Sequence, residues 1–442
     1  MANNNKNAVI EPKTLAGFME LLPNKQILFN RVLDAIRNSY ESFGFLPLDT
    51  PNLEYSSVLF AKAGDEVEKQ VYRFTKGDTD MALRFDLTVP LAKYVAKNYH
   101  NLAFPFRRYQ IGKVYRGERP QKGRFREFYQ ADIDIIGDGS LNILCDGEIP
   151  AIIATVFKNL GFNEFKILIS NRKILQGFLV SLGLAEKTQC ICSNLDKLKK
   201  IGVDKVRAEL EKIELKKVDI DKILEFAAIE GTNTQKLSAL SKIKGGEVFN
   251  EGVEELKAVV GAIDAFGVDK RHFEIDLTIV RGLDYYTGTV FETFLTGHED
   301  IGSVCSGGRY DNLAGLYIDK QLPGVGISIG LTRLFDKLES EFKIKNIPYT
   351  DVLVVSLDED KSAVLKIATL LREKEIKTLV YLEDSKLKTK FKYAEKLEIP
   401  YMAIIGESER ANGTVTLKNI VNGEQHAQIS IDQVVEILTN NM

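Results

Sequence analysis

The chain has 442 residues, of which 44% are hydrophobic and 27% are charged, with a formal net charge of −3. These values are typical of an ordinary globular protein with room for two or three domains. No apolar run is long enough to cross a bilayer, and the N-terminus has no apolar signal core, which argues against a membrane-spanning or secreted protein. We therefore expect a cytoplasmic protein without membrane contact.

The cysteines and histidines do not indicate a metal site. Cys190 and Cys192 are separated by one residue, which is not the usual zinc-binding spacing, and the four cysteines fit reduced thiols. The four histidines form no ligand-like cluster along the sequence. The sequence therefore predicts no structural metal and argues against histidine-based catalysis.

The N-terminal part of the chain predicts one long helix followed by strands. Apolar side chains recur at helical spacing over residues 25–42, and Gly44 ends this pattern. Pro47 and Pro51 then favour an extended chain. Short alternating or apolar runs follow at 70–74, 81–86, 109–116, 127–136 and 273–280. Such runs, separated by short turns, predict an antiparallel sheet.

Two further regions differ from this sheet pattern. Residues 172–270 are rich in Lys, Glu and Leu, lack proline and have helical periodicity, which predicts a helical insertion. Residues 350–442 alternate strand and helix, which predicts an α/β domain with a mainly parallel sheet. We therefore expect an α+β protein whose sheet domain is split into residues 1–171 and 271–345 by the insertion.

Basic residues concentrate between Arg107 and Arg126, where eight of twenty residues are Lys or Arg and only Glu118 is acidic. Arginine suits planar oxyanions such as phosphate because its guanidinium presents forked donors. The alternative is a solvated basic hairpin, since Pro120 and Gly123 predict a flexible loop between two strands. The composition favours the phosphate site.

Polar residues gather on the strand predicted next. Alternation places Gln130, Asp132 and Asp134 on one face of this strand. The same argument places Asp86 and Thr88 together on an earlier strand, where an acid beside a hydroxyl would suit an ammonium group; the alternative is an ordinary polar face. A ligand with a phosphate end and a cationic end would fit this combination.

Three glycine-containing segments allow two interpretations each. In RGLDYYTGTVFE, residues 281–292, adjacent tyrosines on a strand would face opposite sides, so that one could line a pocket, but two half-buried sheet residues are the simpler interpretation. Gly307 and Gly308 permit either a hairpin turn or close backbone approach. Residues 324–334 lack the context of a dinucleotide fingerprint, whereas a strand leading into a helix with Arg333 in its first turn would suit adenine and a phosphate.

Together these segments resemble the class II histidyl-tRNA synthetases over nearly the whole chain. Residues 115–137 are similar to the second class motif and residues 326–334 to the third, both of which are shared across the class. Residues 281–292 and 306–313 are similar to two segments peculiar to the histidyl enzymes. The segment around Pro51 resembles the dimer motif, which implies a homodimer. RFDLTVP resembles the eukaryote-like form, and the family's N-terminal Thr-Arg-Asp triplet is missing.

The resemblance implies a role for each matching residue. The residues implied in histidine binding are Asp86, Leu87, Thr88, Arg116, Gln130, Asp134, Arg281, Tyr285 and Tyr286. Those implied in ATP binding are Arg116, Glu118, Arg124 and Arg333. Arg116, Arg281 and Arg333 are the implied catalytic groups, and Arg281 stands where other class II enzymes use a metal ion.

The resemblance also implies the reaction. The carboxylate of L-histidine attacks the α-phosphorus of ATP, which is accompanied by Mg²⁺, and histidine then passes to the 3′ end of tRNA(His). No side-chain nucleophile is needed. The alternative is a catalytically inactive paralogue that acts as a regulatory subunit in histidine biosynthesis. The presence of the three catalytic arginines and of a C-terminal domain argues against this alternative.

The C-terminal domain resembles the class IIa anticodon-binding domain. Its overall composition is acidic, with 12 Lys and Arg against 15 Asp and Glu over residues 350–442. Basic residues concentrate locally at Lys386, Lys388, Lys390, Lys392 and Lys396, with Phe391 and Tyr393 among them. Such a mixture suits phosphate contact and stacking on unpaired bases, so we expect the RNA-binding surface to be local.

Overall fold

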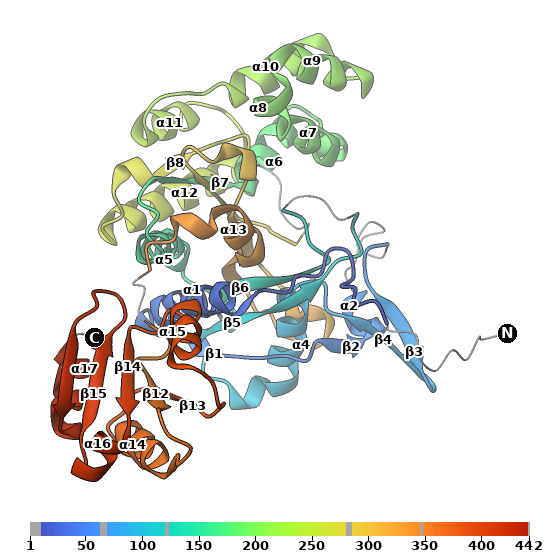
Figure 1. The fold of residues 1–442 in the computed structure, drawn as a ribbon. Coiled ribbons are helices and arrows are strands. Elements are labelled where there is room, and N and C mark those ends of the chain that lie inside the picture. The colour runs from blue at the N-terminus through green and yellow to red at the C-terminus, as the bar shows by residue number, and fades with distance from the viewer. Residues whose placement is uncertain (1–9, 62–68, 120–122, 280–284, 345–347, 441–442) are drawn as a thin grey trace. The chain divides into compact units, whose positions relative to one another are not determined.

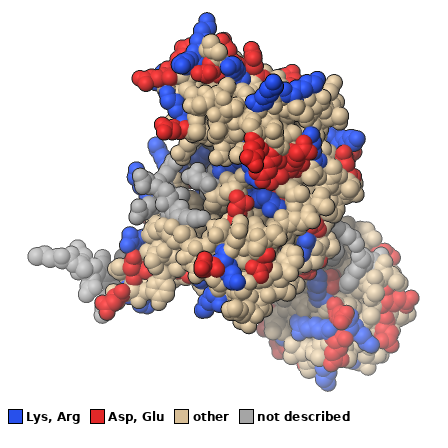
Figure 2. Space-filling model, turned by 180° about the vertical axis from the view of Figure 1, so that it is seen from behind, with Lys and Arg blue, Asp and Glu red and all other residues tan. Residues whose placement is uncertain are grey.

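The computed structural model describes residues 10–61, 69–119, 123–279, 285–344 and 348–440. The chain forms two compact units, Met1–Ile344 and Lys345–Met442 (Figure 1). On the face shown in Figure 2, acidic and basic side chains are interspersed over both units, in keeping with the net charge of −3. Within the described ranges, no helix is both long and apolar enough to span a membrane.

An eight-stranded sheet forms the first unit, with the order β1–β5–β6–β11–β10–β9–β7–β8. Its strands are β1 (Leu46–Pro47), β5 (Phe106–Tyr115), β6 (Glu127–Ile136), β7 (Phe165–Asn171), β8 (Phe273–Ile275), β9 (Thr289–Leu295), β10 (Cys305–Tyr310) and β11 (Gly324–Gly330). Neighbouring strands are antiparallel except in the two outermost pairs, β1 with β5 and β7 with β8. The predicted antiparallel sheet is confirmed for the runs at 109–116, 127–136 and 273–280, whereas those at 70–74 and 81–86 contribute to a separate sheet. β8 is shorter than predicted, because the Asp276 side chain accepts a hydrogen bond from the Thr278 backbone and turns the chain.

Helices bury their apolar sides against this sheet. They are α1 (Pro23–Ser42), α5 (Leu144–Asn159), α6 (Arg172–Ser181), α12 (Glu247–Ala265) and α13 (Leu331–Leu338). The predicted helix at 25–42 corresponds to α1, whose Val32, Ile36 and Tyr40 are completely buried in the main core. α5 and α12 approach closely at Gly147, where an added Cβ would lie 2.3 Å from the Ala262 Cβ.

The predicted insertion is helical throughout. Between α6 and α12 lie the helices α7 (Thr188–Leu195), α8 (Leu198–Ile201), α9 (Val203–Lys212), α10 (Lys217–Ala227) and α11 (Asn233–Leu240). Figure 1 shows these five helices grouped at one end of the first unit. The flanking helices α6 and α12 instead pack against each other and, through α12, against α5 and β7. They therefore also contribute to the layer that covers the sheet.

A second, three-stranded sheet has the order β2–β4–β3. It comprises β2 (Leu53–Tyr55), β3 (Arg73–Lys76) and β4 (Thr79–Leu83), and the helices α2 (Ser56–Leu59) and α4 (Thr88–Asn98) adjoin it. The prediction that Asp86 and Thr88 share one strand face is wrong, because β4 ends at Leu83 and Thr88 begins α4. Asp86 Oδ1 accepts hydrogen bonds from the backbone N–H groups of Thr88 at 3.1 Å and Val89 at 2.9 Å. Its carboxylate therefore caps a helix instead of extending a strand.

The second unit contains a five-stranded sheet with the order β13–β12–β14–β15–β16. Its elements are β12 (Val352–Ser356), α14 (Ser362–Glu373), β13 (Thr378–Tyr381), α15 (Leu387–Lys396), β14 (Tyr401–Ile405), α16 (Glu407–Asn412), β15 (Val415–Asn419), β16 (Gln425–Ile429) and α17 (Ile431–Asn440). The expected mainly parallel sheet is only half correct. β13, β12 and β14 are parallel, but β15 and β16 follow as antiparallel strands, because the connection from β14 to β15 holds only the short helix α16 and that from β15 to β16 is a turn.

Candidate active site

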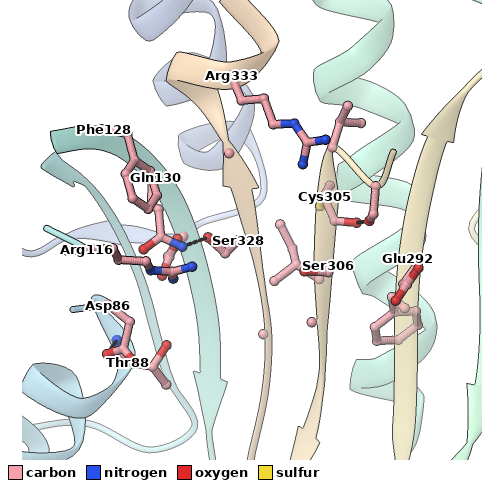
Figure 3. Close-up of a pocket in the computed structure, with 18 of the residues that line it drawn as sticks. Asp86, Thr88, Arg116, Phe128, Gln130, Glu292, Cys305, Ser306, Ser328 and Arg333 are labelled. Atoms are coloured by element: carbon pink, nitrogen blue, oxygen red, sulfur yellow. Dashed lines mark hydrogen bonds between the residues drawn. The ribbon is translucent and has the colours of Figure 1, made fainter. Parts of the chain in front are cut away.

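A cavity of about 500 Å³ opens on the face of the main sheet formed by β6, β9, β10 and β11 (Figure 3). Most of the predicted site residues line it: Asp86, Thr88, Arg116, Glu118, Arg124, Gln130, Asp134, Tyr285, Tyr286 and Arg333. Leu87 is completely buried in the turn before α4 and is not among the lining residues. Arg281 lies outside the described residues. In Figure 3, Asp86 and Thr88 lie at one end of the cavity and Arg333 lies at the other.

β6 supplies the polar floor of the cavity. Gln130, Asp132 and Asp134 all line it, as their alternation along the strand predicts. β6 is held in the middle of the sheet by β5 on one side and β11 on the other. Opposite Asp134 on β11 stands Gly326, where a Cβ would lie 2.3 Å from Asp134 Oδ1. The glycine therefore leaves the space that the carboxylate occupies.

Asp134 is held by two side chains that the sequence did not single out. Tyr310 donates its hydroxyl to Asp134 Oδ1 at 3.0 Å, and the completely buried Arg108 forms an ion pair with Oδ2 at 2.5 Å. Burial raises the pKa of Asp134 to about 6, although the charge of Arg108 opposes this shift. Arg108 lies opposite Asp134 on β5, so only the strand register could have revealed the pairing.

Gln130 and Asp132 are also deeply buried. Gln130 donates from Nε2 to Ser328 Oγ of β11 at 2.7 Å, as the dashed line in Figure 3 shows. Burial raises the pKa of Asp132 to about 7, again against the opposing charge of Arg108. Ser328 was not predicted as a site residue, since nothing in its local sequence marks it.

Arg116 is fixed between two aromatic rings at the end of the hairpin. Its guanidinium carbon lies 4.3 Å from the centre of the Phe85 ring and 5.1 Å from that of Phe128. Its Nε donates to the Phe85 carbonyl oxygen at 3.3 Å. Burial lowers the pKa of Arg116, and the nearby Asp86 opposes this shift, but an arginine remains charged. The group is therefore a cation whose orientation is set before any ligand binds.

Arg124 and Arg333 bring further positive charge to the cavity. Arg124 Nη1 lies 3.6 Å from Glu118 Oε2, across the hairpin. Arg333 stands in the first turn of α13, as predicted from the strand-to-helix pattern. Burial and the repulsion from Arg124 both lower the pKa of Arg333. Two like charges on facing segments create a site that suits a polyanion.

Tyr285 and Tyr286 do not follow the strand expectation. They precede β9, which begins at Thr289, and both line the cavity, with ring centres 4.8 Å apart. The prediction that they face opposite sides is wrong because this part of the chain turns. Arg172 of α6 donates to the Tyr286 carbonyl oxygen at 2.7 Å and holds this turn. Desolvation raises the pKa of both phenols, so both remain protonated donors.

The glycines of β10 allow close backbone approach and do not form a hairpin turn. Gly307 and Gly308 lie in the middle of the strand, paired on both sides. An added Cβ would lie 2.1 Å from the Gly326 oxygen at Gly307, and 2.6 Å from the Thr289 oxygen at Gly308. The Tyr286 ring is 3.1 Å from the latter position. These glycines thus shape the wall of the cavity.

Arg309, the next residue of β10, anchors this wall through a buried ion pair. Its Nη2 and Nε lie 2.8 and 3.0 Å from the two oxygens of Asp146, which is completely buried. We expect Arg309→Ala to lower the free energy of unfolding by about 3–5 kcal/mol, because the Asp146 carboxylate would remain buried without its partner. Urea denaturation monitored by circular dichroism measures this loss. In the double variant Arg309→Met/Asp146→Leu we expect most of it to be recovered, and equal losses in both variants would contradict the argument.

The fold and the cavity together define a class of protein. An antiparallel sheet flanked by helices carries a helical insertion and a cavity lined by arginines and carboxylates, with Asp86 at one end and Arg333 at the other, and a separate α/β unit follows. This is the architecture of the class II aminoacyl-tRNA synthetases.

Comparisons with known proteins identify the family. The family model for histidyl-tRNA synthetase matches residues 17–334, and that for an anticodon binding domain matches residues 351–441. A histidine–tRNA ligase from Clostridium tetani is 52% identical over 439 residues, covering 98% of this chain and 100% of the relative. The chain belongs to the histidyl-tRNA synthetase family, which confirms the predicted family and fold class.

Solved structures agree with this assignment. The crystal structure of a histidyl-tRNA synthetase from Nostoc sp. PCC 7120 is similar with a TM-score of 0.89 at 40% identity, over 98% of this chain and 100% of that chain. A structure from Bacillus halodurans described as an ATP phosphoribosyltransferase regulatory subunit/histidyl-tRNA synthetase has a TM-score of 0.73 at 21% identity and covers 90% of this chain. At that identity the second likeness shows the fold alone.

Proposed function

We propose that this chain is a histidine–tRNA ligase, which activates L-histidine with ATP to histidyl-adenylate and pyrophosphate and then transfers histidine to the 3′ end of tRNA(His). The observation that carries this proposal is that one cavity is lined by carboxylates, tyrosines and arginines, with Asp86 and Thr88 at one end and Arg333 at the other. Amino-acid activation needs this combination, because the substrate pair is cationic at its amino-acid end and polyanionic at its phosphate end.

Histidine occupies the carboxylate end in this proposal. Asp86 keeps Oδ2 for the α-ammonium group, since its Oδ1 already caps α4, and Thr88 lies beside it. Gln130 and Asp134 contact the imidazole ring, because a carboxylate accepts a hydrogen bond from a ring N–H and so fixes the orientation of the ring. Tyr285 and Tyr286 complete the pocket, and Leu87 contributes only backbone.

ATP occupies the arginine end. Arg116 bridges the histidine carboxylate and the α-phosphate, while Glu118 and Arg124 contact adenine and the outer phosphates. Arg333 binds phosphate from the opposite side, and Arg281 takes the position held by a metal ion in other class II enzymes. The histidine carboxylate attacks the α-phosphorus directly, so that catalysis comes from alignment and from positive charge aimed at the developing charge.

Mg²⁺ accompanies ATP in this proposal. Over the described part of the chain, no group of three or more His, Cys, Asp or Glu could hold a metal ion. The phosphate oxygens and water would therefore be the main ligands of the ion, which suits the octahedral oxygen coordination of Mg²⁺. The chain's own contribution is to hold the phosphates with arginines.

The second unit binds the anticodon in this proposal. Lys386, Lys388, Lys392 and Lys396 are exposed on or beside α15, and Tyr393 is 39% exposed among them. Lys390 is removed from the expected RNA-binding surface, because it is buried and donates from Nζ to the Ser356 carbonyl oxygen at 2.6 Å. The proposed surface therefore consists of these four lysines and Tyr393, whereas Phe391 is partly buried and has Lys418 over its ring.

A homodimer in the cytoplasm is also part of the proposal. Leu53 and Tyr55 of β2 and Phe74 of β3 are 43%, 64% and 43% exposed on the small sheet. Neighbouring exposed apolar side chains on one sheet are typical of an interface. A second copy of the chain covering this sheet would bury them.

Two assays on the wild-type protein test the function. Histidine-dependent exchange of pyrophosphate into ATP measures the first step, and charging of tRNA(His) with labelled histidine measures the second. We expect both activities, whereas the regulatory-subunit alternative requires neither. A folded protein that supports neither step would reject the proposal.

A further inference from the structure

One carboxylate of the cavity, that of Asp132, has no role in the proposed binding of histidine and ATP. Asp132 lies on β6 between Gln130 and Asp134 and faces the same cavity. It is 2% exposed, and its Oδ1 has no hydrogen-bond partner in the described part of the structure. Ser328 hydrogen-bonds to the Asp132 carboxylate, so Oδ1 is the oxygen that remains unmatched. An unmatched buried oxygen is costly, so a protein that keeps one in a ligand cavity gains from it when the ligand binds.

Asp132 differs from Asp134 in this respect. Both oxygens of Asp134 are engaged, one by Tyr310 and the other by Arg108. The charge of Arg108 is therefore already matched, and Asp132 is a surplus negative charge beside it. The raised pKa of Asp132 reflects this surplus, since its burial outweighs the attraction of Arg108.

A second acceptor at the same end is also unmatched. Gln130 donates to Ser328 from Nε2, which leaves its Oε1 buried and without a hydrogen-bond partner in the described structure. Two unmatched acceptors close together require a ligand that presents several N–H donors. Histidine meets this requirement, because its ammonium group and its ring nitrogens are all potential donors.

We propose that Asp132 accepts a hydrogen bond from one ring nitrogen of histidine while Asp134 accepts from the other, so that the ring is bound with both nitrogens as donors. This inference rests on the proposed function and adds a specificity residue to it. An imidazole carries two N–H groups only in its cationic form, which a pocket with two carboxylates favours. Substitution of either ring nitrogen then leaves a buried acceptor unpaired, which explains how the pocket would reject analogues.

The experiment compares Asp132→Asn and Asp132→Ala with wild type in pyrophosphate exchange. The substrates are histidine and its two ring N-methyl isomers, and the wild-type reaction with histidine tests the proposed function separately. We expect Asp132→Asn to raise the KM for histidine about tenfold or more, with kcat changed less than about threefold, as for the loss of a charged hydrogen bond. Asp132→Ala should improve kcat/KM for one N-methyl isomer, and not for the other, relative to histidine.

Asp276→Asn provides the matched control. Asp276 is also a buried carboxylate, 8% exposed, but it pairs with Lys199 and lies outside the cavity lining. Its variant should leave the KM for histidine within about twofold of wild type. A similar increase in both variants would overturn the inference, because it would show a general effect of losing a buried carboxylate.

Thermal unfolding of the ligand-free protein separates a binding role from a structural one. Asp132→Asn removes the cost of burying a surplus charge, so its Tm at pH 8 should rise by about 2 °C or more. A carboxylate that stabilised the fold would give a lower Tm or a protein that does not fold, and either result would overturn the inference. An unchanged KM for histidine would overturn it as well.

Discussion

Replacing Arg116 by alanine is expected to reduce histidine-dependent pyrophosphate exchange by about a hundredfold to a thousandfold, the scale for removing one preorganised donor from a reacting centre. The guanidinium is stacked between Phe85 and Phe128 and tied through Nε to a backbone oxygen, so its orientation needs no adjustment during the reaction. Its proposed position between the histidine carboxylate and the α-phosphate makes it useful mainly as charge develops. The loss should therefore appear in kcat more than in either KM.

Two further variants test whether the loss of exchange comes from the Arg116 guanidinium itself. Arg116→Lys retains the charge but not the planar fork, so it should recover only part of the rate. Arg119→Ala removes a cation from the same hairpin that is exposed and outside the cavity lining, and should leave exchange within about twofold of wild type. If Arg116→Ala folds normally and exchanges at a rate close to wild type, Arg116 does not contact the reacting groups.

Period-two alternation was the part of the site that the sequence predicted best. β6 runs from Glu127 to Ile136, as expected, and Gln130 and Asp134 share a face because successive side chains of any strand point to opposite sides. The step from β11 into α13 likewise placed Arg333 correctly. These features follow from local backbone geometry, which a single sequence contains.

Pairings between distant segments were not predictable in this way. Four of the basic residues in the Arg107–Arg126 segment serve the fold: Arg107 with Glu148, Arg108 with Asp134, Lys113 with Glu127, and Arg126 with the Glu118 backbone. Composition alone attributed their charge to a phosphate site. Which arginine faces the cavity depends on strand register and on partners far away in sequence, so the roles of Arg116 and Arg124 came from the family resemblance and not from composition.

Local turns also explain why the prediction of a regular strand was wrong at Asp86 and at Tyr286. Asp86 caps α4, and Tyr286 is held in a turn by Arg172 from α6, so neither obeys strand alternation. In both cases a side chain forms the backbone hydrogen bond that a neighbouring strand would otherwise form. Functional residues gathered at these interruptions of regular structure, where the rules of alternation do not apply.

The second large effect is expected at Arg333, which lies at the end of the cavity away from Asp86. We expect Arg333→Ala to lower kcat/KM for ATP by about a hundredfold, equivalent to about 2.7 kcal/mol, with most of the loss in the KM for ATP. Arg333 lies at the far end of the cavity from Asp86, where it faces Arg124 rather than a carboxylate of the cavity floor. A polyphosphate between these two cations would turn their repulsion into attraction, and the first turn of α13 adds the partial positive charge of a helix N-terminus. Exchange measured over a range of ATP concentrations gives both constants.

The same repulsion predicts opposite effects on stability with and without ATP. Without ATP, Arg333→Ala should not lower the Tm, because the variant removes the repulsion from Arg124, which outweighs the attraction of Asp300 for the Arg333 guanidinium. With ATP, the wild-type Tm should rise by ligand linkage, and the variant's should rise much less. Lys337→Ala, one turn further along α13 and outside the cavity lining, is the matched control and should keep the ATP-dependent rise. If the Arg333→Ala variant keeps the full ATP-dependent rise in Tm, the phosphates bind elsewhere. If it loses only this ATP-dependent rise, the triphosphate lies between β6 and α13. That position is across the cavity from the carboxylates that hold histidine.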